Sequence, residues 1–307
     1  RGAKNMTKTK QLKQGSLSRS KRKKLLLLIP IGIMILCLSL YPTLRGIYLG
    51  FTNYKVGRPI EFNGFENYIG IYNSGYLLTA FKNIGIMLLI SVIAIYIISM
   101  MLALLLNSNI PLRGLWRALL IIPWAVPPIA KVAMWKAIFN PVSGYLNAYL
   151  QRLHIIDEAV NWTTDVNFAK YTIIVVFIWG CIPFTTLSLL ATLQQVPTDL
   201  YEAAVLDGAS PVKYFRYVIL PYLNQTTAIT MSLVVVWIMN DFSSQYLLTK
   251  GGPGSATLTP MVEAYRQGFS YGNFGYASAY GNIMIVCVSV LIFIYIKTMN
   301  ARDKGVN

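Results

Sequence analysis

One polar segment carries residue types and a spacing suited to docking against another protein. It contains Glu202-Ala203-Ala204, Gly208, and then Ser210-Pro211. The residues from 200 to 206 are strong helix formers, and a helix start at Thr198 or Asp199 would supply an N-cap. Gly208 can take a positive φ and end that helix, while serine followed by proline is a typical start for the next one. We predict a helix, a glycine turn and a second helix.

The side chains of this segment fit a contact surface. Ala203 and Ala204 are small enough to allow close docking, and Glu202 can pair with a basic group or cap a backbone donor of a partner. Lys213 and Arg216 give the second helix a partly charged face.

A second group of polar residues lies inside apolar stretches, where polar groups are costly unless they face a bundle interior or a cavity. Asn240 and Asp241 are the strongest candidates, and Lys131 is an intramembrane cation. Between residues 179 and 184, Gly180 and Pro183 flank Cys181 and precede Phe184, and we expect them to break the helix, as at cavities within membrane proteins.

The composition indicates that these segments belong to an integral membrane protein. The chain has 307 residues, of which 55% are hydrophobic and 12% charged, and its mean hydropathy is +0.52. A soluble domain carries about 25% charged residues. A soluble enzyme, a disordered chain and a disulfide-rich secreted protein are therefore excluded.

The net charge of +16 is concentrated in a tail. Residues 1–24 hold ten of the 27 Lys and Arg residues and no acid. This pattern favours membrane orientation and contact with anionic lipid rather than nucleic-acid binding. Met6 is the expected start, which leaves open whether Arg1–Asn5 is native. Three cysteines in apolar stretches and the single His154 predict no disulfide and no metal site.

Six stretches reach the roughly 20 apolar residues that a membrane helix needs. They give an all-α, polytopic fold with spans at 25–44, 83–106, 115–139, 170–193, 223–248 and 274–297. With both termini in the cytoplasm, the inside segments carry 15 Lys and Arg residues and the outside segments carry 7. The positive-inside rule favours this orientation, mainly through the tail. We therefore divide the chain into a cytoplasmic tail (1–24), a six-helix domain (25–297) with a cytoplasmic loop at 194–222, and a C-terminal tail (298–307).

The polar segment resembles the EAA loop of ABC importer permeases, whose pattern is E-A-A, three residues, G, nine residues and I-x-L-P. Glu202-Ala203-Ala204, Gly208 and Leu220-Pro221 match it, with Val218 in place of isoleucine. Further stretches are similar to the carbohydrate-uptake permeases of the maltose and glycerol-3-phosphate type; they are Phe51-Thr52-Asn53-Tyr54, Phe65-Glu66-Asn67-Tyr68, the run from Arg117 to Pro127, and Thr249-Lys250-Gly251-Gly252-Pro253.

The resemblance implies a type I ABC importer permease fold and a set of partners. These are a second homologous permease, two ATP-binding subunits, an extracytoplasmic solute-binding protein, membrane lipid and a carbohydrate, in the cytoplasmic membrane of a bacterium. The chain itself would be no enzyme and would need no cofactor, because ATP and Mg²⁺ belong to the partner ATPase. Glu202, Ala203, Ala204, Gly208, Lys213 and Arg216 would couple to that ATPase.

The resemblance also implies that sugar contacts lie beside the proline of span four and in span five, at Cys181, Phe184, Asn240 and Asp241. Several readings stay open. The alternative for Phe184 is a position facing lipid or the core, and the alternative for Cys181 is a packing role. The alternative for Asn240 and Asp241 is hydrogen bonding with the partner permease. Lys131 either snorkels, pairs with Asp241 or meets an acidic sugar. A polyol-phosphate permease is the alternative cargo class, and a secondary transporter or a membrane scaffold are more distant alternatives.

Overall fold

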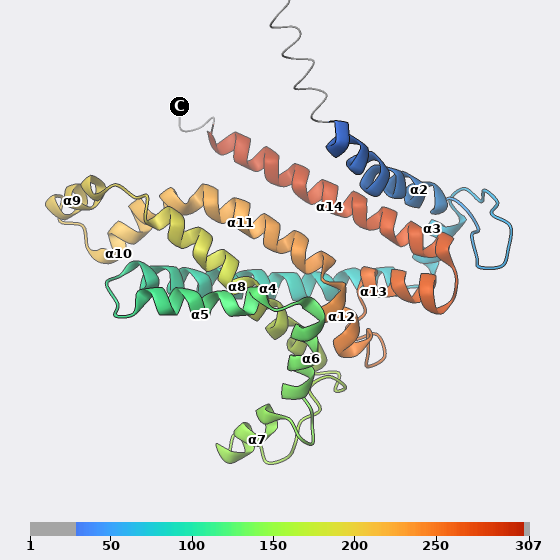
Figure 1. Ribbon diagram of the computed structural model, residues 1–307, viewed down its shortest axis with the longest axis horizontal. Coiled ribbons are helices and arrows are strands. Elements are labelled where there is room, and N and C mark those ends of the chain that lie inside the picture. The colour runs from blue at the N-terminus through green and yellow to red at the C-terminus, as the bar shows by residue number, and fades with distance from the viewer. Residues whose placement is uncertain (1–28, 304–307) are drawn as a thin grey trace, which may run out of the picture.

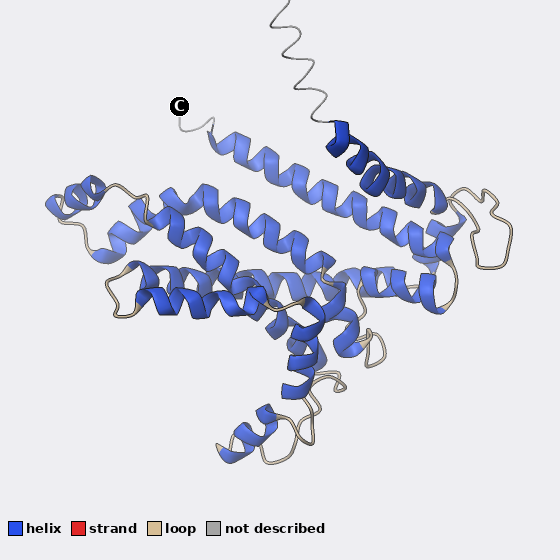
Figure 2. Ribbon diagram, viewed as in Figure 1, coloured by secondary structure: helices blue, strands red, loops and turns tan. Residues whose placement is uncertain are grey.

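The computed structural model describes residues 29–303, which are helical throughout apart from turns and loops (Figure 2). The strand-like pairs within that range are two isolated bridges, Thr52 with Phe62 and Lys55 with Asn273. The all-α prediction is therefore confirmed. The basic tail at 1–24 lies outside the described residues.

The first transmembrane helix runs from Ile29 to Leu49 and includes a π-helical turn, η1, and α2. The remaining helices follow in chain order: α3 (Glu66–Asn73), α4 (Tyr76–Asn107), α5 (Arg113–Ala125), α6 (Pro128–Ile138), α7 (Tyr145–Arg152), α8 (Ala169–Leu193), α9 (Thr198–Leu206), α10 (Pro211–Tyr214), η2 (Phe215–Ile219), α11 (Leu220–Asn240), α12 (Phe242–Thr249), α13 (Pro260–Tyr265), η3 (Arg266–Ser270) and α14 (Phe274–Asp303).

Among the described residues, five helices are long and apolar enough to cross a membrane, and a bent pair makes a sixth span if it is counted as one. The five are 29–49, 76–107, 169–193, 211–240 and 274–293. The expected spans are thus present, although the second begins seven residues earlier than predicted.

The third expected span, 115–139, is not one straight helix. It consists of α5 and α6, which meet at an angle of 97°. The break falls at Val126-Pro127-Pro128, where Val126 is extended at ψ 125°. A residue before proline disfavours the helical region, and proline has no N–H to donate. Two adjacent prolines therefore end α5 although the apolar sequence continues.

The predicted break in span four is wrong, because α8 continues through Gly180 and Pro183. Side chains supply polar contacts at this turn. Ser99 Oγ of α4 donates to the carbonyl oxygen of Ile182 at 3.3 Å, and Thr185 Oγ1 donates to that of Cys181 at 3.1 Å. Such contacts allow proline inside membrane helices.

The fifth span ends eight residues before the predicted limit of 248, at Asn240, and it begins earlier than the predicted 223. Helix α11 ends at Asn240, and Asp241, at ψ 71°, separates it from α12. The Asp241 side chain caps α12 by accepting from the Ser244 N–H at 2.9 Å. A capping carboxylate with non-helical backbone angles favours a new helix start over continuation.

The core lies where α4 packs along α8, and α11 covers the same seam (Figure 1). Met87 and Ile95 of α4, Ile173 of α8 and Val234 of α11 are buried together. A second cluster, around Leu189, Leu193 and Leu223, holds the far ends of α8 and α11. Helices α8 and α11 therefore form one packed unit along their length.

The first helix and α14 lie side by side at the edge of the bundle (Figure 1). Asn282 of α14 joins them, because its amide donates to the Ile47 carbonyl oxygen at 3.0 Å and to the Tyr68 hydroxyl of α3 at 2.7 Å. This pair covers the outer side of the bundle rather than entering its core.

Candidate functional site

The segment at 198–219, here called the elbow, comprises α9, α10 and η2. Gly208 adopts φ +69°, and Ser210 caps α10 by accepting from the Lys213 N–H at 3.4 Å. The predicted helix, glycine turn and second helix are thus observed. The cap of the first helix differs: the cap position is Pro197, whose extended backbone starts the helix at Thr198, and Asp199 lies in the first turn.

The elbow extends beyond the bundle at the end where α8 finishes and α11 begins (Figure 1). Glu202, Ala203 and Gly208 are exposed, as are Lys213 and Arg216, while Ala204 is half-buried. No ion pair or side-chain hydrogen bond engages Glu202 within residues 29–303. The carboxylate is therefore available to a partner.

Apolar side chains of the elbow also face outward. Leu206 is 88% exposed, and Val205 and Val212 are exposed beside it. Apolar residues gathered on a protruding surface are typical of a protein interface.

The base of the elbow is fixed to the bundle. Tyr214 and Phe215 pack against the cluster of Leu189, Leu193 and Leu223, and the Tyr201 and Tyr214 rings meet edge-on at 5.2 Å. The Tyr222 hydroxyl donates to the Gln195 carbonyl oxygen at 3.0 Å, which ties the start of α11 to the end of α8. A displacement of the elbow would therefore move both helices.

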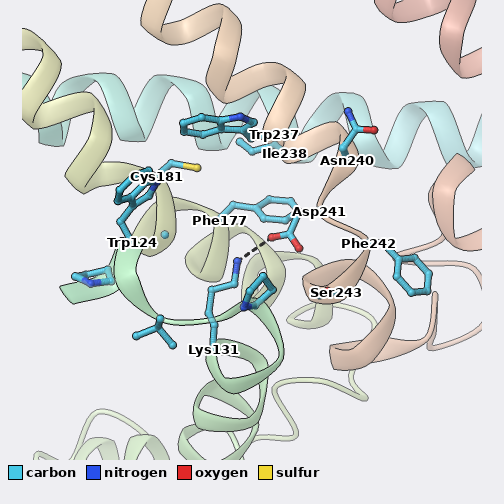
Figure 3. A pocket seen from close by; sticks show the side chains of 14 residues that line it. Trp124, Lys131, Phe177, Cys181, Trp237, Ile238, Asn240, Asp241, Phe242 and Ser243 are labelled. Carbon is cyan, nitrogen blue, oxygen red and sulfur yellow. Dashed lines mark hydrogen bonds and ion pairs between the residues drawn. The ribbon is translucent and has the colours of Figure 1, made fainter. Parts of the chain in front are cut away.

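Away from the elbow, at the end of α11, lies a cavity of about 390 Å³ (Figure 3). It forms where the α5–α6 bend, the middle of α8 and the break between α11 and α12 meet. Among its lining residues are four predicted ones, namely Lys131, Cys181, Asn240 and Asp241.

An ion pair crosses this cavity. Lys131 Nζ of α6 donates to Asp241 Oδ2 at 2.9 Å, and the two side chains are 14% and 18% exposed. Of the readings that the sequence left open for Lys131, pairing with Asp241 is the one observed. The bend at Pro127 directs α6 towards α12, and Lys131 also lies against Gly180 of α8, where a Cβ would be in ordinary contact with Nζ at 3.7 Å.

The other predicted residues occupy distinct positions. The Asn240 amide donates to the Val236 carbonyl oxygen at 2.8 Å and remains exposed. Phe184 does not line the cavity; its ring packs on Trp237, 4.7 Å between centroids. Cys181 is half-buried in the wall.

Sequence reasoning missed the aromatic lining, which consists of Trp124, Phe177, Trp237 and Phe242. Two signals were present: Trp124 lies two residues before the break at Val126, and Trp237 lies one helical turn before Asp241. Aromatic faces beside a few polar groups are typical of small-molecule sites. Within residues 29–303 no three His, Cys, Asp or Glu side chains gather to hold a metal ion.

Comparison with known proteins identifies the family of this chain. Residues 95–302 match the family described as the binding-protein-dependent transport system inner membrane component. The sulfoquinovosyl glycerol transport system permease protein of Agrobacterium fabrum is 30% identical over 280 residues, which cover 91% of this chain and 90% of that protein. The trehalose/maltose transport system permease protein of Thermococcus litoralis is 30% identical over 279 residues, which cover 90% and 93%.

A solved structure shares the fold. A chain of a bacterial ABC transporter involved in the import of the acidic polysaccharide alginate superposes with a TM-score of 0.79 at 22% identity. The match covers 93% of this chain and 98% of that one.

Proposed function

The chain belongs to the family of binding-protein-dependent transport system inner membrane components, and on that premise we propose that it forms half of the pathway of an ATP-driven oligosaccharide importer. As an ABC importer permease it is a multi-pass membrane protein and not itself an enzyme. The observation that carries the proposal is the elbow, a fixed and exposed helix pair that offers small, acidic and apolar side chains to a partner.

The partner at the elbow is an ATP-binding subunit. Ala203 and Ala204 let its surface approach the α9 backbone, and Glu202 pairs with a basic side chain there. Lys213 and Arg216 contact its acidic or polar groups. ATP and Mg²⁺ are held by that subunit, and its closure moves the elbow and, with it, α8 and α11.

The complete importer contains a second homologous permease, two ATP-binding subunits and an extracytoplasmic solute-binding protein in a bacterial cell membrane. The elbow and both termini lie on the cytoplasmic side, in agreement with the basic tail at 1–24. The cavity then faces the outer half of the membrane, where a binding protein can deliver cargo.

The cargo is an oligosaccharide. Aromatic rings at Trp124, Trp237 and Phe242 suit the apolar faces of sugar rings, and Asn240, Ser243 and Lys131 suit their hydroxyl groups. The functions named for the relatives, trehalose and maltose transport among them, support the same substrate class.

Affinity purification of the tagged chain from its native membrane in mild detergent tests the assembly. We expect mass spectrometry to identify a P-loop ATPase and a second permease, and we expect sugar-loaded binding protein to stimulate ATP hydrolysis by the recovered complex. Recovery of the chain alone, under conditions that keep a control ABC importer intact, would contradict the proposal.

A further inference from the structure

The charge balance of the cavity is set by two residues. Among the described residues that line it, Lys131 and Asp241 are the charged ones, and they face each other at 2.9 Å. The remaining polar lining side chains, such as Asn240 and Ser243, are neutral. The cavity therefore has no net charge to offer an ionic ligand.

The Asp241 carboxylate is held firmly in this arrangement. Its Oδ1 accepts from the Ser244 N–H at 2.9 Å, and its Oδ2 accepts from the Ser244 hydroxyl at 2.7 Å as well as from Lys131. It also lies at the start of α12, where the helix dipole favours a negative charge. Asp241 cannot turn away without uncapping α12, so Lys131 keeps its counter-ion.

We propose that the Lys131–Asp241 ion pair makes the cavity bind an uncharged oligosaccharide in preference to one that bears carboxylates. This inference rests on the proposed function. It goes beyond family membership, because a transporter of the same fold imports an acidic polysaccharide.

The physical reason is the cost of an unpaired charge in a poorly solvated site. An acidic sugar must either draw Lys131 away, which strands the Asp241 carboxylate, or bind beside that carboxylate with no counter-ion. A neutral sugar requires neither step. Its hydroxyl groups can accept hydrogen bonds from the remaining Lys131 N–H groups, and its rings can stack on Trp124 and Trp237. The ion pair stays intact.

Direct binding to the purified importer complex, without the solute-binding protein, tests the selection. The probes are radiolabelled maltotriose and arabinotriose, which are neutral, and trigalacturonate, which is acidic and of similar size. We expect the wild type to bind a neutral probe at least about tenfold more tightly than trigalacturonate.

Two single variants should change the preference in opposite directions. Asp241→Asn keeps an N-cap for α12 but frees the lysine charge, so the ratio of acidic to neutral binding should rise about tenfold. Lys131→Met leaves the carboxylate, so that ratio should fall further below the wild-type value. The double variant should return to the wild-type preference, and Lys136→Met, which changes an exposed cation outside the cavity, should leave the ratio unchanged.

Equal or tighter trigalacturonate binding by the wild type would overturn the inference. An Asp241→Asn complex that binds the neutral probe with an unchanged ratio would also overturn it. If the intact complex bound neither class of sugar, the proposal of oligosaccharide import would be contradicted, and this inference with it. That result is distinct from binding with the wrong charge preference, which contradicts this inference alone.

Discussion

The elbow lies where α8 ends and α11 begins, whereas the cavity lies beside the middle of α8 and the end of α11. The two regions satisfy their polar groups in opposite ways. In the cavity, Lys131 and Asp241 compensate each other within the chain. In the elbow, Glu202 is exposed and Leu206 is 88% exposed. A site that is complete by itself suits a small neutral ligand, whereas one with available charge and apolar surface requires a protein partner. Variants in the two regions should therefore fail in different assays.

The largest expected effect is at Gly208. Its φ of +69° is strained for a β-branched residue, at a cost of about 1–3 kcal/mol, so Gly208→Val should redirect α10 and misplace the whole contact surface. We expect ATP hydrolysis stimulated by loaded binding protein to fall about 100-fold, the effect of roughly 2.7 kcal/mol. Sugar binding to the cavity should persist.

Gly208→Asn is the matched control, because asparagine tolerates the left-handed region and no atom crowds a Cβ at this position. It should retain most of the stimulated activity. A fully active Gly208→Val complex would show that the turn has no part in coupling.

A cavity variant should give the converse result. Trp237→Ala removes an aromatic face worth about 1–1.5 kcal/mol, so sugar affinity should weaken about tenfold. Recovery of the ATPase on purification should be unchanged. Trp116→Ala, on α5 outside the cavity lining, is the control for loss of a tryptophan. Equal sugar affinity in the Trp237→Ala and Trp116→Ala variants would show that the sugar binds outside this cavity.

An effect of the same size, but on coupling, is expected from Glu202→Gln. It removes one charge-assisted contact worth about 1–1.5 kcal/mol, so stimulated ATP hydrolysis should fall about tenfold. The melting temperature of the isolated chain should stay constant because the side chain is exposed. The same change at Glu158, in the loop before α8, should leave hydrolysis at the wild-type rate. A lowered melting temperature for Glu202→Gln would indicate an internal structural role instead.

The smallest effect is expected from Ser210→Ala, which removes the cap of α10. Loss of a cap costs about 1 kcal/mol, part of which the packed base of the elbow should absorb, so hydrolysis should fall only about twofold to fivefold. Ser210→Asp keeps a capping oxygen and should behave as the wild type. A deficit as large as that of Gly208→Val would mean that the cap, rather than the turn, fixes the elbow.

The sequence predicted the elbow well because its signals are local. A glycine after a helix and a serine before a proline determine backbone angles within a few residues, and Gly208 and Ser210 behave accordingly. Span three was predicted less well, since the apolar run through Val126 satisfied the length criterion while Pro127-Pro128 overrode it. In span four the opposite occurred: α8 stays helical through Pro183, which is buried among neighbouring helices, a tertiary setting that the local sequence does not contain.

The cavity depends on contacts that local patterns do not contain. Pairing of Lys131 with Asp241 was one of several open readings, and the 97° bend decided among them by turning α6 towards α12. Trp124 and Trp237 were missed because an apolar span with many aromatics gives no sign of which ring faces a cavity. Phe184 was expected in the substrate path and instead supports the Trp237 ring.

The uninterrupted length of α8 also has an evolutionary consequence. Within α8, about 18 Å, at 1.5 Å per residue, separates Cys181 in the cavity wall from Leu193 at the end that leads into the elbow. Substitutions beside Gly180 can alter what is carried without touching the surface around Gly208. A duplicated permease could therefore evolve a new cargo specificity while it still docks to the same ATPase. One ATPase could then serve several permeases.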